Sequence, residues 1–221
     1  MSSVVGHSLL GIVVYACCPL SKHGLLSVSV PFSPRSLAGI WLLCLVVVAV
    51  APDLDYVVSW LDMGHYGGLR VSHSLMFSLW IPGAVTFGLW RAGIGGKSLT
   101  VMTMQMVVAG LSHLVLDLLV GVSPVPALWP LSQSPWKLPF GVLPSAGRLQ
   151  WGNYYLYRNL KIEMGVLLPL SCCAVALFWW HRQSANCWAQ SWAGRLWIWS
   201  GCSVGLVIAA YFAHQAYLLP R

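Results

Sequence analysis

The chain has 221 residues, of which 58% are hydrophobic and 8% are charged. About one quarter of the residues in an average soluble domain are charged, so this chain lacks the polar surface of a soluble globule and is expected to be a polytopic membrane protein. Its formal net charge of +7 comes from scattered lysines and arginines rather than from a basic run. We therefore expect the lipid bilayer as a partner and no nucleic acid.

Six charge-poor stretches are candidates for helices in the membrane, since about 20 apolar residues are needed to cross a bilayer. They are residues 2–20, 36–51, 71–90, 98–120, 162–180 and 196–218. The segment after the fourth stretch, which begins "VSPVPALWPLSQSPWKLPF", has too many prolines for a helix and too many aromatic residues for a solvated linker. The sequence thus predicts an all-α membrane bundle of about six helices, a single domain over residues 1–221, with a proline- and tryptophan-rich interfacial loop.

The seven cysteines form no C-x-x-C pair, and most lie in apolar stretches. They predict neither a disulfide framework nor a thiolate zinc site, and buried free thiols are the simpler interpretation. The amino terminus lacks the positively charged region of a signal peptide, so we interpret it as the first helix.

All acidic residues fall on one side of the membrane when the six stretches alternate in direction. These residues are Asp53, Asp55, Asp62, Asp117 and Glu163. Four of the seven histidines fall on the same side, namely His7, His65, His73 and His113. Ionisable groups placed near a bilayer are costly, and their grouping on one side indicates a functional site.

The stretch "GLSHLVLDLLVG" places His113 and Asp117 four residues apart, and therefore on one face of a helix. Two such groups suit a single cation, and a set of imidazoles and carboxylates without a thiolate favours zinc or manganese. Together with His7, the "PDLD" carboxylates and His73, this pair predicts a metal site at one membrane face.

Each of these residues also has a structural interpretation. "PDLD" could be a helix stop followed by a cap, and Ser72 or Ser74 could cap a helix while His73 faces the headgroups. Arg70 could neutralise a bound phosphate or anchor a helix end in the headgroups.

The remaining polar residues are interpreted separately. His23, His181 and His214 are interpreted as structural, and Asp62 and His65 are candidates for a lid or for groups beside the ligands.

Several short motifs occur in a recognisable order: "GHSLLG" at 6–11, "PDLD" at 52–55, "SHSL" at 72–75 and "GLSHLVLDLL" at 110–119. With "LWPLS", "GRLQW" and "NLKIEMGVLL" further along, they resemble the YdjM-like family of inner-membrane-associated metal-dependent hydrolases over about residues 4 to 170. The resemblance implies a multi-pass protein of the bacterial inner membrane with a bound divalent metal. The ligands that it implies are His7, Asp53, Asp55, His73, His113 and Asp117, with Glu163 as the counterpart of a family glutamate.

The chain departs from the family pattern in two places. Many members have His-Arg-Gly-x-Thr-His-Ser where this chain has "RVSHS", which leaves Arg70 as a shifted counterpart. A histidine that often follows the fourth helix is replaced by "VGVSP", which puts a second metal in doubt. The ligand order is also similar to that of zinc-dependent phospholipase C, with Asn159 in place of a histidine, and this similarity implies phosphoester chemistry.

These observations predict a hydrolase in which a cation held by His7, His73, His113 and Asp117 activates water. Asp53 or Asp55 would bridge a second ion or act as general base, and Arg70 would stabilise a developing oxyanion. The expected substrate is an amphiphilic or lipid-linked small molecule. Two alternatives stay open: an ion-coupled or metal transporter, and a non-catalytic membrane protein with a structural metal.

The basic residues divide evenly between the two membrane sides. Those opposite the site lie in short connections, where the positive-inside rule counts most, so we expect the site to face outward.

Overall fold

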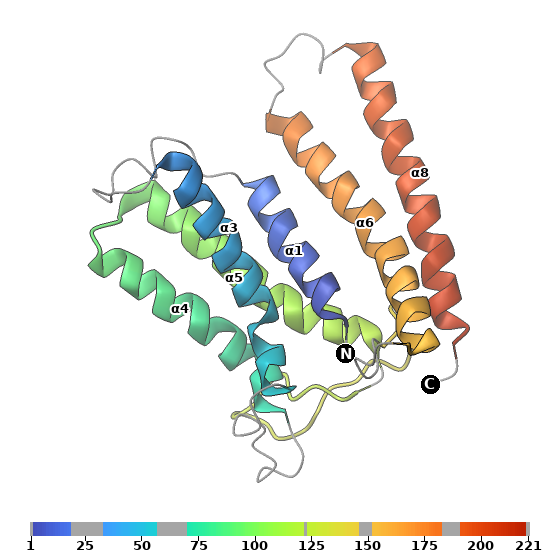
Figure 1. Cartoon of the computed structure of the whole chain (residues 1–221), viewed down its shortest axis with the longest axis horizontal. Coiled ribbons are helices and arrows are strands. Elements are labelled where there is room, and N and C mark those ends of the chain that lie inside the picture. Colours follow the sequence, from blue (N-terminus) through green and yellow to red (C-terminus); the bar gives the residue numbers. More distant parts are fainter. Residues whose placement is uncertain are drawn as a thin grey trace.

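The structure is a computed structural model, which describes residues 2–18, 33–56, 70–121, 123–145, 152–182 and 191–219. The expected positions His23, Asp62 and His65 lie outside these ranges. In chain order the elements are α1 (Val4–Cys17), α3 (Pro34–Val50), the 3-10 segments η1 (Ala51–Tyr56) and η3 (Val71–His73), α4 (Leu75–Arg91), α5 (Gly96–Val120), α6 (Tyr154–Arg182) and α8 (Trp192–Tyr217) (Figure 1). Within the described ranges there are six α-helices and no strand, so the prediction of an all-α bundle of about six helices is confirmed.

Four of the six helices are long and apolar enough to cross a membrane: α3 continued into η1, α5, α6 and α8. The two others are shorter, with 14 residues in α1 and 17 in α4. At about 1.5 Å per residue, neither reaches the roughly 30 Å of the hydrocarbon core. The six predicted stretches therefore all form helices, but only these four meet the length of a full crossing within the described residues.

Serine side chains begin four of the helices. Ser3, Ser33, Ser74 and Ser191 each accept a hydrogen bond from the backbone N–H three residues later, at the starts of α1, α3, α4 and α8. Such caps satisfy one of the free N–H groups at a helix start. At the other end of α5, Gly121 has φ of 62°, a left-handed conformation that favours glycine and ends the helix.

Helices α1, α3, α4 and α5 pack closely at glycines and share an apolar core. Leu45, Ala49 and Met106 of this core are fully buried. A Cβ at Gly11 of α1 would lie 2.9 Å from the Cα of Val46 in α3. Because the backbones approach this closely, small residues hold the helices in register.

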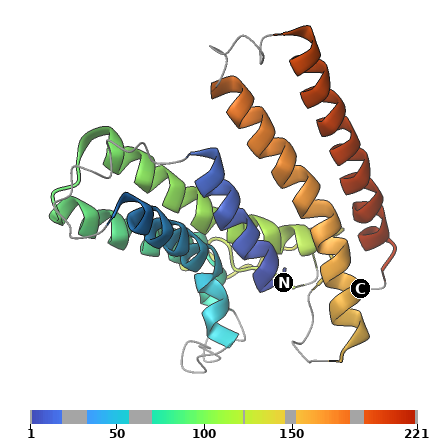
Figure 2. The same cartoon turned by 45° about the horizontal axis from the view of Figure 1, so that its top comes forward.

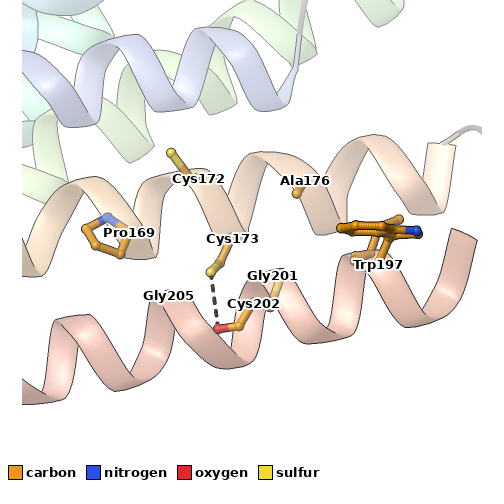
Figure 3. Close-up of a pocket in the computed structure, with 9 residues that line it drawn as sticks. Pro169, Cys172, Cys173, Ala176, Trp197, Gly201, Cys202 and Gly205 are labelled. Carbon is orange, nitrogen blue, oxygen red and sulfur yellow. Dashed lines mark hydrogen bonds between the residues drawn. The ribbon is translucent and has the colours of Figure 1, made fainter.

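Helices α6 and α8 lie side by side on the far side of α1 (Figures 1 and 2). A Cβ at Gly205 of α8 would lie 2.8 Å from Cys173 Sγ of α6, so this pair too depends on a small residue. Figure 3 shows an apolar pocket of about 380 Å³ between the two helices. Cys173, which lines it, donates a 3.6 Å hydrogen bond to the carbonyl oxygen of Cys202.

The proline- and tryptophan-rich loop is hydrogen-bonded to the start of α4 and to the end of α5. The backbone N–H of Leu75, at the start of α4, donates to Ala127 O at 2.9 Å, and Val142 N donates to Leu119 O, near the end of α5, at 2.8 Å. An isolated antiparallel bridge pairs Val125 with Trp136. The loop therefore lies at the end of the bundle where α4 begins and α5 ends.

Candidate metal centre

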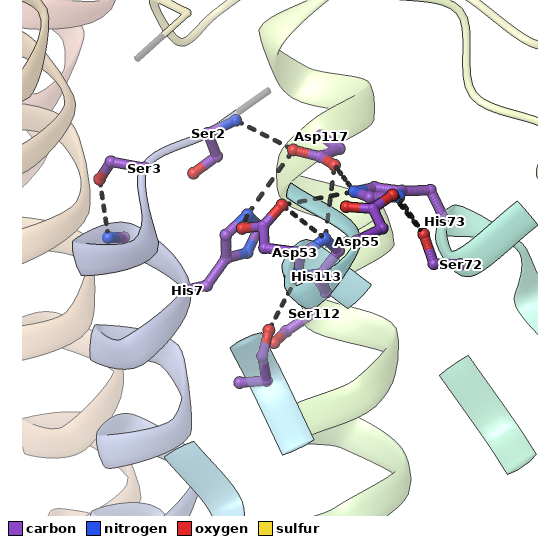
Figure 4. A network of polar contacts seen from close by, with 12 residues as sticks. Ser2, Ser3, His7, Asp53, Asp55, Ser72, His73, Ser112, His113 and Asp117 are labelled. Atoms are coloured by element: carbon purple, nitrogen blue, oxygen red, sulfur yellow. Dashed lines mark hydrogen bonds and ion pairs between the residues drawn. The ribbon is translucent and has the colours of Figure 1, made fainter. Parts of the chain in front are cut away.

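Three imidazoles and two carboxylates from separated parts of the chain meet at one end of the bundle (Figure 4). His7 lies in the first turn of α1, Asp53 in η1, His73 in η3, and His113 and Asp117 in the last turns of α5. All five are buried, and both His7 and His113 have no exposed surface. The predicted convergence of these five residues is thus present in the geometry.

The Nε2 atoms of the histidines face the carboxylate oxygens. His73 Nε2 lies 3.4 Å from Asp53 Oδ1 and 3.3 Å from Asp117 Oδ2. His113 Nε2 lies 3.8 Å and 3.5 Å from the same two oxygens. A tetrahedral site with metal–ligand bonds of about 2.0–2.1 Å has ligand atoms about 3.3–3.4 Å apart. Four of the separations among these atoms, which we call the cage, are thus close to those of a zinc-like site. The ligand atoms of Asp53, His73 and His113 all lie within 4.8 Å of one another.

The atoms of this cage have no hydrogen-bond partner among the described residues. They are His73 Nε2, His113 Nε2, Asp53 Oδ1 and Asp117 Oδ2, and His7 Nε2 shares this property. A buried polar atom without a partner costs about 1–3 kcal/mol, and more when it is charged. With neutral imidazoles the two carboxylates give the cage a charge of −2, which a divalent cation would balance. The donor set thus fits a bound metal.

The other ring nitrogens of His113 and His73 are held by hydrogen bonds. His113 Nδ1 lies 2.8 Å from Ala49 O, an acceptor only, so Nδ1 carries the proton and Nε2 presents its lone pair to the cage. His73 Nδ1 lies 2.9 Å from Ser72 Oγ. Hydrogen bonds of this kind fix the ring orientation of metal-binding histidines.

Asp55 lies behind His73, with its Oδ2 3.7 Å from His73 Nδ1, and pairs with Arg70. Arg70 Nε donates to Asp55 Oδ2 at 2.8 Å, Arg70 Nη2 donates to Oδ1, and Ser72 Oγ donates to Oδ2 at 2.7 Å. A chain of contacts thus runs from Arg70 through Asp55 and Ser72 to His73. Among the described residues, two groups have ligand atoms that all lie within 4.8 Å of one another: His7, His113 and Asp117, and Asp53, His73 and His113. Asp55 belongs to neither group. Its predicted roles as ligand and base stay predictions, and the geometry shows it orienting Ser72.

Glu163, which enters from α6, also lies outside those two groups. Its Oε1 accepts from Ser2 Oγ and, at 2.9 Å, from Ser3 N. The backbone N–H of Ser2 in turn donates to Asp117 Oδ1 at 2.9 Å. Glu163 therefore reaches the cage through the Ser2–Ser3 segment, and its predicted role as a ligand stays a prediction.

Sequence reasoning missed the groups that orient the candidate ligands. Ser72 was considered only as a cap, a role that Ser74 has, and Ser2 was not considered. The sequence feature that could have indicated the role of Ser72 is its position next to His73, a candidate ligand. Of the histidines interpreted as structural, His181 and His214 are exposed and belong to neither group of candidate ligands.

A narrow pocket leads from the loop to the cage. Arg70, His73 and Asp117 line it from one side and residues 123–126 from the other. The space open to the centre of a water molecule is about 20 Å³, which holds one water. Arg70 thus lies at the entrance, with one quarter of its side chain exposed.

The fold and the buried His/Asp cage define a helical integral membrane protein with groups that could hold a metal ion. A family model described as the YdjM inner membrane protein matches residues 1–216. The chain belongs to this family, and it is an inner membrane protein. No curated protein and no solved structure matches it significantly. The similarity to zinc-dependent phospholipase C therefore depends on the order of the candidate ligands alone.

Proposed function

We propose that the chain is a membrane-bound metal-dependent hydrolase that acts on a phosphoester or lipid-linked substrate. The observation that supports this best is the buried cage of unpartnered atoms contributed by His73, His113, Asp53 and Asp117. A divalent cation bound there, zinc or manganese, would lower the pKa of a water and polarise a phosphoryl or carbonyl oxygen. These four residues would hold the cation, and Ala49 O and Ser72 would keep the two imidazoles oriented.

Two further groups would act on the substrate. Arg70 lies at the entrance of the pocket, where its guanidinium could pair with a phosphate that displaces part of its contact with Asp55. The entrance holds only one water, so a phosphoryl group would reach the cage only after residues 123–126 move. In this proposal the loop acts as a cover that keeps bulk water out between turnovers.

The surface of the loop supports an amphiphilic substrate. Leu131, Trp136 and Phe140 are exposed there, with Leu131 at 92%. Exposed apolar and aromatic side chains at the end of a membrane bundle suit the boundary between headgroups and acyl chains. A substrate with its headgroup at the entrance and its tail in the bilayer would reach Arg70 without leaving the membrane.

The proposal is tested on the purified chain in detergent. Bound metal is measured by mass spectrometry, and phosphodiester, phosphomonoester and carboxylic ester substrates are screened, both soluble and lipid-linked. We expect bound metal and hydrolysis in the natural chain and the loss of both in His113→Ala. The exposed His214→Ala serves as the matched control and keeps both. A folded chain that binds no divalent cation would contradict the proposal.

A structural metal is the second candidate, and one observation favours it. The cage supplies four ligand atoms, which is the closed coordination of structural zinc, and the pocket beside it holds only one water. Under this proposal the cation would be bound and the melting temperature would fall on its removal, but no substrate would be cleaved.

A further inference from the structure

The two carboxylates of the cage each present one oxygen to His7 and the other to the remaining histidines. Asp53 Oδ2 lies 3.7 Å and Asp117 Oδ1 lies 3.6 Å from His7 Nε2. The opposite oxygens, Asp53 Oδ1 and Asp117 Oδ2, are the ones that face His73 and His113. Both carboxylates thus lie between two sets of imidazole nitrogens, one oxygen to each set.

His7 is buried without any hydrogen bond from its ring. Neither Nδ1 nor Nε2 has a partner among the described residues, and the residue has no exposed surface. Its ring stacks on His113 with 3.8 Å between centroids, so the two imidazoles lie face to face and their Nε2 atoms approach the carboxylates side by side. Within the described ranges, His7 Nε2 faces two carboxylate oxygens at 3.6 and 3.7 Å but makes no hydrogen bond, and this geometry points to a ligand between them.

We propose that the centre holds two divalent cations, with Asp53 and Asp117 bridging them. The histidine that is replaced by "VGVSP" is not needed for this second ion, because His7 supplies its imidazole. The first cation lies in the cage of His73, His113, Asp53 Oδ1 and Asp117 Oδ2. The second is bound by His7 Nε2, Asp53 Oδ2 and Asp117 Oδ1, and water or substrate fills its remaining positions. This inference deepens the proposed function and rests on it.

The second cation also narrows the class of substrate. With neutral imidazoles and two carboxylates, one divalent cation leaves the set of five residues uncharged, whereas two give it a charge of +2. A positively charged pair of cations is suited to an anionic group, and two-metal sites clamp both sides of a phosphoryl centre. The expected substrate is therefore a phosphoester rather than a neutral ester or amide.

The number and the coupling of the bound ions test this proposal. The full chain, purified in detergent and stripped with a chelator, is titrated with Mn²⁺ while bound metal and the electron paramagnetic resonance spectrum are recorded. We expect two equivalents of Mn²⁺ and the spectrum of an exchange-coupled pair, since bridged ions lie about 3.5–4 Å apart. His7→Gln should bind one equivalent and give the spectrum of an isolated ion. His214→Gln, which alters an exposed histidine, should match the natural chain.

The outcomes separate this inference from the proposed function. A single equivalent in the natural chain, or two equivalents without coupling, overturns the bridged pair even where the chain still hydrolyses its substrate. No bound metal overturns both proposals. Two coupled ions retained in His7→Gln would place the second ion elsewhere and overturn the assignment to His7. Should the variant fail to fold, the stoichiometry and coupling of the natural chain still decide the question.

Discussion

Asp53 and Asp55 are two residues apart, yet the structure gives them different contacts. We propose different roles for them, which substitution by asparagine would separate. Asp53 presents Oδ1 to the cage, whereas the carboxylate of Asp55 is held by Arg70 and Ser72. We expect Asp53→Asn to lose the cation, because it removes the charge of a direct ligand. Asp55→Asn should weaken binding and leave the number of bound ions unchanged.

The size of the Asp55 effect follows from its contacts. Loss of a partner that orients a metal-bound histidine lowers metal affinity about 10- to 100-fold, which is about 1.4–2.7 kcal/mol. Asparagine keeps one oxygen that can accept from Ser72 Oγ, so the orientation of His73 is weakened rather than lost. The Arg70 side chain is 25% exposed, so water solvates part of the guanidinium and limits the cost of breaking the ion pair.

Competition with a fluorescent chelator measures the affinity of each purified variant for Zn²⁺. Circular dichroism and size-exclusion chromatography establish that the variants are folded. A folded Asp55→Asn chain that has lost its cation as completely as Asp53→Asn would refute the reasoning, because Asp55 would then be a direct ligand. Unchanged affinity would equally refute the path through Ser72.

Three further predictions concern packing, metal linkage and orientation. A Cβ at Gly110 would collide with Ser78 O, so Gly110→Ala should lower the free energy of unfolding by about 1–3 kcal/mol and lower the melting temperature. Gly83 faces open space, so Gly83→Ala should leave the melting temperature unchanged. Equal melting temperatures in the two variants would contradict this prediction. A divalent cation at 100 times its Kd adds about 2.7 kcal/mol to the free energy of unfolding, so removing it with a chelator should lower the melting temperature. Loss of metal without a change in melting temperature would argue against a bound cation in the cage. Helix α8 ends near the start of α1 in Figure 1, and His7 lies in the first turn of α1. A reporter fused after α8 should therefore be active outside the cytoplasm, and cytoplasmic activity would show the opposite orientation.

The sequence predicted the helices and the end of the bundle where the polar residues meet, because hydropathy and alternation depend on local patterns. It could not distinguish Asp53 from Asp55. Both "PDLD" carboxylates were predicted as ligands, with a helix stop as the alternative. Residues 51–56 form a 3-10 segment, in which residues two apart point about 240° around the axis from each other. His113 and Asp117 were placed correctly because four residues in an α-helix bring side chains to one face.

Contacts between segments far apart in the chain could not be predicted from the sequence patterns. Glu163 was expected at the right end of its helix, yet its partners Ser2 and Ser3 are about 160 residues away in the chain. These contacts depend on how closely α1 approaches α6, which no periodicity indicates. The ligand roles predicted for Asp55 and Glu163, which lie outside the two groups of candidate ligands, therefore stay predictions.

The position of α1 in the bundle depends on the small residues that it buries. Its buried residues are Gly6, His7 and Gly11, two of which have no side chain that could form an apolar core. A Cβ at Gly6 would meet the carboxylate of Glu163, and one at Gly11 would meet the backbone of α3. The glycines thus let α1 approach the backbone of α3 and the Glu163 side chain of α6, which brings His7 to the depth of Asp53 and Asp117. In "GHSLLG" the flanking glycines set the position of the helix, and the histidine between them supplies the one side chain that the centre needs from it.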